Sequence, residues 1–491
     1  MKTIPAFPSV SFQQTAKGHL MFACFSLASR RRLFPLGLAL IFSLALACAI
    51  CPGAERASWP NGLHFRPAKG AFADAIPFFW QGTYHVFYLR AGLGGTTWEH
   101  LSSTDLLHWR EHPTALRPGT AGEPDGDSVF TGSIIENAGV FHAFYTGWNP
   151  RHATHREQIM HATSPDLDAW TKRPELTFHA DGAIYQDDGG KDFRDPFVFW
   201  NEPSREFWML LFARRASDGV GVVGVWTSPD LLSWQAAPPL DGAIGSECPD
   251  FFEIDGRPHV LMSFGSMFWQ SAAALRAPWQ RSRTAHLDTF MLYAAKRLFD
   301  GKRHVAFGFV RDLQGERDFG ARNWGGTMCL PREIYRDAAG ELRVRPVAEL
   351  DRAFGESAWS LAAPAPVFEP RAGEWKIGAG ELRGHGDVAS VVIKAPADYM
   401  LRATVKSSPI ARLEFRFRDQ GARGGGYSLV VDRAHQTTEL RAPLHVFERP
   451  TPIPSDGPVR VQAFVLGNII ECFVNDAHAF TTRAYDFPGA T

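Results

Sequence analysis

A short motif that recurs three times constrains the fold of this chain more than any other feature. It reads S-x-D-L-x-x-W and begins at Ser103, Ser164 and Ser228, so the spacing between successive copies is nearly constant. A regular period of this kind indicates one supersecondary unit repeated in a linear or radial array. In each copy Ser and Asp can cap a turn and Trp can pack between units. We therefore assign these aspartates a structural role.

Strands rich in β-branched and aromatic residues accompany the repeat and continue beyond its third copy. Intervals of about 45 to 65 residues separate them, which fits four short strands with turns, or one propeller blade. The sequence therefore predicts a five-bladed β-propeller over residues 59–350. The five segments are 84–89, 140–147, 206–213, 257–265 and 302–310.

The remainder of the chain indicates a second β domain. An Ala- and Pro-rich stretch, 351–371, is typical of a linker. Period-2 alternation then resumes over 372–491, which favours a β-sandwich. The predicted fold class is all-β, a five-bladed β-propeller followed by a C-terminal β-sandwich.

The N-terminal segment, residues 1–54, is typical of an export signal. Three arginines at 30–32 precede an apolar run, Leu33 to Ile50, and small residues follow. The run is long enough that an uncleaved membrane anchor stays open, and both Sec and twin-arginine export fit. We expect a secreted or periplasmic protein, anchored to the membrane if the signal is retained.

Charge and cysteine content narrow the class of ligand. The chain has 51 basic and 52 acidic residues, a net charge of −1, which gives no electrostatic footprint for nucleic acid. Only Cys248, Cys329 and Cys472 follow the N-terminal segment, and the 18 histidines are scattered. This is neither a disulfide framework nor a metal-ligand pattern, so we expect no metal and no cofactor. The sequence leaves the oligomeric state open.

Three carboxylates occupy the same place in their repeats. Asp74, Asp195 and Glu247 each precede the strand segment of their own repeat at nearly the same offset. Equivalent positions of rotated blades converge on one axis, so these side chains should share a pocket. Asp127 lies further ahead of its strand and is a weaker fourth candidate.

Converging carboxylates in a neutral, exported chain favour glycoside hydrolysis. One carboxylate attacks the anomeric carbon or activates water, and a protonated one donates to the leaving oxygen. Crowding of like charges raises one pKa and helps to keep the acid protonated. A divalent-cation site and purely structural carboxylates are the alternatives that the residues leave open.

Four segments carry a resemblance to a known family. From about Gly62 onward the chain resembles glycoside hydrolase family 32, the invertases, inulinases and levanases. The resemblance implies a propeller with a β-sandwich and a retaining mechanism. It implies that Asp74 is the nucleophile, Glu247 the acid/base and Asp195 the transition-state stabiliser. The segments are LHFRPAKGAFADAIPFFW, SVFTGS, FRDPFVF and ECPDFF.

The chain departs from the family pattern around the nucleophile. Ala73 and the run 75–77 replace the Asn and Pro-Asn-Gly that flank the family's Asp. Leu89 stands in place of a Gln, and Glu99 in place of a Gly beside Trp98. Because polar groups that read sugar hydroxyls discriminate strongly, we expect altered specificity with hydrolysis retained.

Arg194, Trp98, Phe130 and Trp324 are the candidate substrate-binding residues. Arg194 can either fix Asp195 or contact substrate. Trp80, Trp148 and Trp269 are further stacking candidates, and for every Trp, packing in the core is the alternative. We expect Cys248 to shape the surroundings of the acid/base rather than to act as a nucleophile.

The predicted function is that of an exported retaining glycoside hydrolase. Its substrate would be an oligo- or polysaccharide with β-fructofuranosidic bonds of the sucrose, inulin or levan type, or a related furanoside. A fructosyltransferase and a non-catalytic carbohydrate-binding propeller are the alternatives. No partner other than the sugar is expected.

Overall fold

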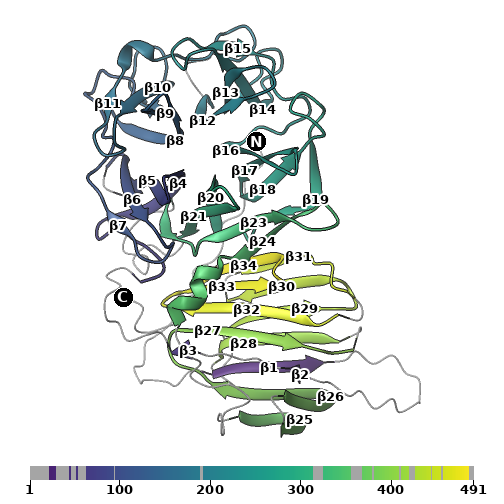
Figure 1. Cartoon of the computed structure of the whole chain (residues 1–491). Helices are drawn as coiled ribbons and strands as arrows, with labels where there is room; N and C mark the ends of the chain where they lie inside the picture. The colour runs from purple at the N-terminus through teal and green to yellow at the C-terminus, as the bar shows by residue number, and fades with distance from the viewer. Residues whose placement is uncertain are drawn as a thin grey trace, which may run out of the picture.

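The protein folds into a ring of blades and a second body of strands (Figure 1). The structure is a computed structural model. It describes residues 62–92, 94–187, 189, 192–312, 324–354, 368–378, 381–408, 411–419, 426–443, 445–454 and 457–485, and three short strands before them.

Three blades are separate four-stranded antiparallel sheets. Blade 2 comprises β8 (Ser128–Asn137), β9 (Val140–Trp148), β10 (Glu157–Ser164) and β11 (Thr171–Lys172). Blade 3 comprises β12 (Arg194–Asn201), β13 (Glu206–Arg214), β14 (Gly221–Ser228) and β15 (Gln235–Ala237). Blade 4 comprises β16 (Glu247–Ile254), β17 (Arg257–Phe264), β18 (Ser266–Ser271) and β19 (Gln280–His286).

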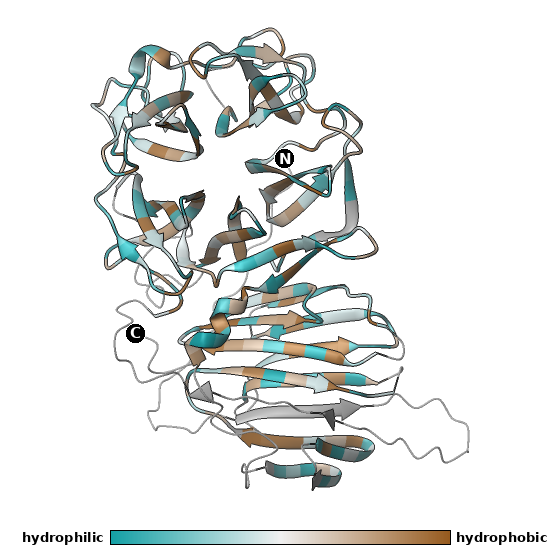
Figure 2. Ribbon diagram, viewed as in Figure 1, coloured by the Kyte–Doolittle hydropathy of each residue, from teal (hydrophilic) through white to brown (hydrophobic). Residues whose placement is uncertain are grey.

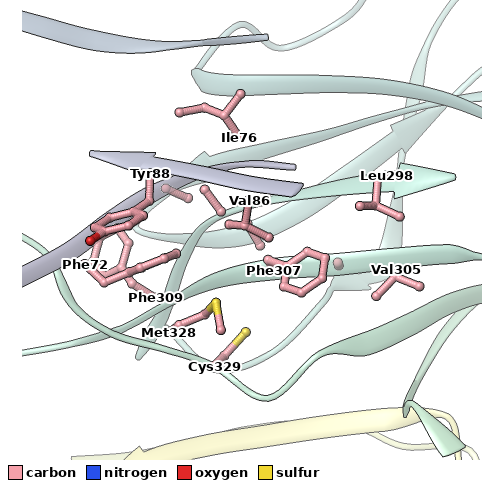
Figure 3. Packing of buried hydrophobic residues seen from close by; sticks show 14 of the residues in the cluster. Phe72, Ile76, Val86, Tyr88, Leu298, Val305, Phe307, Phe309, Met328 and Cys329 are labelled. Carbon is pink, nitrogen blue, oxygen red and sulfur yellow. The ribbon is translucent and has the colours of Figure 1, made fainter. Parts of the chain in front are cut away.

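Blades 1 and 5 join in one nine-stranded sheet. Blade 1 comprises β4 (Ala71–Trp80), β5 (Thr83–Ala91), β6 (Thr97–Ser103) and β7 (Arg110–Glu111). Blade 5 comprises β20 (Leu292–Phe299), β21 (His304–Arg311), β23 (Arg332–Arg336) and β24 (Leu342–Pro346). Between them β22 (Gly326–Met328) pairs with both β21 and β4, which closes the ring. Apolar side chains of both blades pack together here (Figure 3). The predicted five-bladed propeller is confirmed.

The recurring motif has the structural role that the sequence predicted. Ser103 Oγ accepts a hydrogen bond from the Leu106 amide, and Asp105 accepts one from the His108 amide, so the two side chains cap the turn. Each motif Trp packs edge-on against a Phe of the neighbouring blade. The pairs are Trp109–Phe307, Trp170–Phe87 and Trp234–Phe144, with ring centroids 5.7, 5.9 and 5.4 Å apart.

A β-bulge interrupts the first strand of all five blades at the same level. Bulges leave residues out of the ladder and re-aim their side chains, and they are frequent next to active sites. In blades 3 and 4 the bulge holds Asp195 and Cys248 in the left-handed region, with φ of +65° and +55°. The register shifts fall at Ala73/Ala75, Val129/Gly132, Arg194/Phe197, Glu247/Asp250 and Tyr293/Lys296.

The second body is a large antiparallel sheet, and the structural relatives described below have a β-sandwich at this place. Apolar and polar residues alternate along its strands (Figure 2). Its strands after the propeller are β25 (Phe368–Gly378), β26 (Glu381–Lys394), β27 (Tyr399–Val405), β28 (Arg412–Asp419), β29 (Tyr427–Asp432), β30 (Thr437–Ala442), β31 (His445–Pro450), β32 (Val459–Leu466), β33 (Ile469–Val474) and β34 (His478–Arg483).

The segments that flank the propeller are described in part. Two short 3-10 helices, Pro174–Leu176 and Ala348–Phe354, lie in blade 2 and after blade 5. The second helix and β25 both overlap the predicted linker, whose residues 355–367 lie outside the described ones. Of the predicted export segment, only β1 (Phe22–Ala28), β2 (Leu44–Ala45) and β3 (Cys51–Pro52) are described, paired with strands of the second body.

One apolar core runs through both bodies. Phe464, Phe473 and Ala479 of the sandwich belong to the same buried cluster as the residues of blades 1 and 5. The fully buried Arg332 forms ion pairs with Asp288 of the propeller and Glu471 of the sandwich. Among the residues described, no helix has both the length and the apolar character needed to cross a membrane.

Candidate active site

The three predicted carboxylates meet in one cavity. Asp74, Asp195 and Glu247 come from the bulged first strands β4, β12 and β16, and they share a cavity of about 490 Å³. The convergence inferred from their common offset is what the propeller geometry produces. The other lining residues are Ala91, Gly92, Gly95, Thr96, Ser128, Phe130, Glu157, Arg194, Cys248, Tyr293 and Trp324.

Asp74 is buried in a strongly acidic environment. The residue is 7% exposed, and its Oδ1 has no hydrogen-bond partner among the described residues. The Cys248 thiol lies 3.6 Å from Oδ2 and donates to it. Burial, with the charges of Asp195 and Glu247, raises the pKa of Asp74 to about 7, although Lys296 opposes this. A buried oxygen without a partner, facing a cavity, is suited to bonding with a bound ligand.

Asp195 is held rigidly beside Asp74. Its amide donates to Thr146 Oγ1 at 2.8 Å, and its Oδ2 accepts from the Cys248 amide at 2.8 Å. Burial raises the pKa of Asp195 as well. The left-handed backbone at both Asp195 and Cys248 creates this contact, because it turns the Cys248 N–H toward the neighbouring blade.

Glu247 is the most accessible of the three. Its side chain is 41% exposed. The Tyr293 hydroxyl donates to Oε2 at 2.6 Å and Arg194 Nη2 donates to Oε1 at 3.2 Å. Both oxygens are therefore oriented by neighbours from other blades, and the group can still reach a ligand in the cavity.

Arg194 lies at the centre of an ionic network. It pairs with Glu157 at 3.2 Å and Asp192 at 2.7 Å as well as with Glu247. The pKa of Arg194 is raised because these carboxylates and Asp195 outweigh the effect of burial. Burial raises the pKa of Glu157 to about 7. Of the two roles predicted for Arg194, the structure shows the ionic one, and the cavity position leaves contact with substrate open.

The aromatic candidates divide between cavity and core. Phe130 and Trp324 line the cavity, and the Phe130 ring stacks on Trp148 at 5.5 Å. Trp98 does not line it, which corrects the prediction of a substrate contact. Strand alternation on β6 turns Trp98 into the core, where it is 0% exposed and packs against Tyr145. Its indole donates to the Phe130 carbonyl at 2.8 Å, so it supports the cavity wall from behind.

The residues that depart from the family pattern do not face the cavity with polar groups. Ala73 and Leu89 are fully buried in the core. Glu99 accepts hydrogen bonds from Thr97 and Thr114, and it pairs with Arg90. Its charge is satisfied locally. Trp80 and Trp269 also pack in the core.

Two polar groups of the cavity escaped the sequence reasoning. Tyr293 lies on β20, the first strand of blade 5, and precedes His304 of β21 at the offset that the carboxylates share. That offset would have found it if hydroxyl groups had been considered. Glu157 begins β10, the third strand of blade 2, where no such signal exists. Asp127 does not line the cavity, and its carboxylate accepts from Ser128 Oγ at 3.0 Å.

Among the described residues, metal-ligand types cluster only away from the cavity. Two groups of His and Asp side chains have their ligand atoms within 4.8 Å of one another. Sequence reasoning missed them because their members come from separate segments. They are His100, His112 and Asp168, and His155, His179 and Asp187.

Comparison with known proteins agrees with this geometry. The model of the glycosyl hydrolases family 32 N-terminal domain matches residues 64–346, more than half of the chain. The β-fructofuranosidase insoluble isoenzyme CWINV1 of Arabidopsis thaliana is 26% identical over 338 residues, 60% of this chain. The match spans 57% of that relative, so the chain covers less than two thirds of its length.

Solved structures share the fold at low identity. Fructan 1-exohydrolase IIa of Cichorium intybus is 19% identical with a TM-score of 0.64, over 90% of this chain and 92% of that one. A mutant Bombyx mori β-fructofuranosidase in complex with sucrose is 17% identical with a TM-score of 0.64, over 87% and 89%. Fold, family model and converging carboxylates lead to one conclusion: the chain belongs to glycoside hydrolase family 32.

Proposed function

We propose that the protein is a retaining glycoside hydrolase that cleaves β-fructofuranosidic bonds. The observation that carries the proposal is the placement of Asp74, Asp195 and Glu247 in one cavity, with Asp74 Oδ1 unpaired and Glu247 accessible. Relatives named β-fructofuranosidase or fructan exohydrolase, one of them in complex with sucrose, support the substrate class.

In this mechanism Asp74 attacks the anomeric carbon and forms a glycosyl-enzyme. Glu247 gives its proton to the leaving oxygen, then removes a proton from the water that hydrolyses the intermediate. Arg194 and Tyr293 hold Glu247 in place during both steps. Asp195, fixed by the Cys248 amide, faces the same cavity and would bond hydroxyls of the sugar.

The nucleophile must lose its proton before it attacks. Because the pKa of Asp74 is about 7 in the free protein, only part of the population is ionised at neutral pH. A neutral sugar does not remove the acidic charges nearby. We therefore expect kcat/KM to rise with pH through about 7 on its acid side.

The sugar unit that fills the cavity is expected to differ from the usual fructosyl unit or to be held differently. Ala73 and Leu89 present only apolar atoms, so no side-chain amide flanks Asp74 on either side. A related furanoside is therefore part of the proposal. So is export directed by residues 1–54, which a mass measurement of the mature protein from the producing cell would test.

The test is product release from sucrose, inulin, levan and other furanosides by wild-type protein and by Asp74→Asn. Release that disappears in the variant supports the proposal. Glu247→Gln, mixed with an activated furanoside, should accumulate a covalent adduct on Asp74 detectable by mass spectrometry. If nothing is released and no adduct forms, while sugar still binds, the protein is a carbohydrate-binding propeller. Transfer to sugar acceptors in place of water would identify a fructosyltransferase.

A further inference from the structure

We propose that His100, His112 and Asp168 form a site for one divalent transition-metal ion between blades 1 and 2. His100 lies on β6, His112 directly follows β7, and Asp168 lies in the motif turn after β10. None of the three lines the cavity of the active site. Imidazole and carboxylate ligands suit ions such as Zn²⁺.

The ligand atoms already stand close to coordination distance. The Nδ1 atoms of His100 and His112 lie 3.1 and 2.9 Å from the same oxygen, Asp168 Oδ1. Around a tetrahedral zinc with bonds of about 2.0–2.1 Å, neighbouring ligand atoms are about 3.3 Å apart. Small shifts therefore suffice to admit an ion among the three atoms.

The remaining ring nitrogens have the partners that metal-bound histidines use. His100 Nε2 lies 2.9 Å from His85 Nδ1, and His112 Nε2 lies 2.7 Å from Ser102 Oγ. A histidine that binds metal through one nitrogen normally donates its other N–H to a neighbour, which fixes the tautomer. Both Nδ1 atoms are then free to present a lone pair to the ion.

His112 carries a buried nitrogen that the protein does not satisfy. Its side chain is only 10% exposed. Its Nδ1 lies near Asp168 but in a direction that makes no hydrogen bond. Buried polar atoms rarely lack a partner, and an ion would supply one. The rings of His100 and His112 are stacked at 4.1 Å, so coordination requires a turn of His112 about its Cβ–Cγ bond, a torsion with broad wells.

The next blade junction shows that this ligand set is not a by-product of the repeat. Blade 2 keeps a histidine at the first position, His161. At the second position Arg173 replaces His112, because each donates its backbone N–H to the preceding histidine's carbonyl. At the fifth position of the blade 3 motif, Leu232 stands where blade 2 has Asp168. A cation and an apolar side chain cannot bind a metal ion, so the site exists at one junction.

The test is titration of Zn²⁺ into the tag-free full chain after chelator dialysis, followed by calorimetry and thermal denaturation. We expect wild-type protein to bind one equivalent at this site and to melt at higher temperature with Zn²⁺. His112→Arg and Asp168→Leu, which copy the next junction, should weaken binding at least 10-fold and abolish the melting shift. Ser102→Ala should weaken it about 10- to 100-fold.

The control is His155→Gln, which removes a ligand type from the second cluster. It should leave the wild-type affinity at the proposed site unchanged. Unchanged melting of all variants in chelator shows that each is folded. The proposal is overturned if wild-type protein binds no Zn²⁺. It is equally overturned if His112→Arg and Asp168→Leu bind as wild type does, or if only His155→Gln loses binding.

Discussion

Replacement of Asp74 by Asn should destroy activity and stabilise the fold. The side chain is nearly isosteric, so packing is preserved while one buried charge is removed. As nucleophile, its loss should lower kcat/KM by about 10⁴-fold or more. The stability gain follows from the same feature, because the folded protein holds this carboxylate in a buried cluster with Asp195 and Glu247.

The size of the gain depends on pH in a defined direction. A carboxyl whose folded pKa is about 7, against 3.8 unfolded, binds its proton more tightly when folded. Its contribution to stability is therefore lost as pH rises from about 4 to 7. Linkage gives a cost of about 2 kcal/mol at pH 5 and about 4 kcal/mol at pH 8. Asp74→Asn removes this cost.

Thermal denaturation at the two pH values measures it. At about 2 °C per kcal/mol for a domain of this size, Tm should rise by about 4 °C at pH 5 and about 8 °C at pH 8. Glu111→Gln, an exposed carboxylate of blade 1, is the matched control and should change stability by less than about 0.5 kcal/mol. A Tm gain that does not grow with pH, or a loss, would refute the reasoning.

Four further predictions rest on the same structure. Trp98→Ala should cost about 3–5 kcal/mol of stability, measured by denaturation, whereas Trp324→Ala, at the cavity, should raise KM with little change in Tm. Lys296→Met should move the acid limb of the pH–kcat/KM profile upward, because Lys296 lowers the pKa of the nucleophile. Tyr293→Phe should lower kcat about 10-fold or more with the fold intact, since the hydrogen bond to the acid/base is lost. Burial lowers the pKa of His161 to about 3, so stability should fall as pH drops below about 6.5, less steeply in His161→Phe.

The repeat and the common offset of three carboxylates were visible in the sequence for a physical reason. Blades are equivalent by rotation, so a residue at one offset returns to one level of the axis. The motif Trp residues were placed correctly by the same argument.

What the sequence did not reveal depends on contacts between blades. The bulges that re-aim Asp195 and Cys248 leave no local signature in the residue pattern. Trp98 was misassigned because a strand residue next to the cavity can face either side. Glu157 enters the site from a third strand, where the offset carries no information.

The shared core has a consequence for how this protein could evolve or be re-engineered. Arg332 is neutralised by Glu471 from the sandwich as well as by Asp288, and leaving such a cation half-paired costs about 3–5 kcal/mol. Much of the marginal stability of a typical domain is of that order. The sandwich is thus not an accessory module that can be shuffled, swapped or trimmed. Both bodies must be inherited, expressed and optimised together.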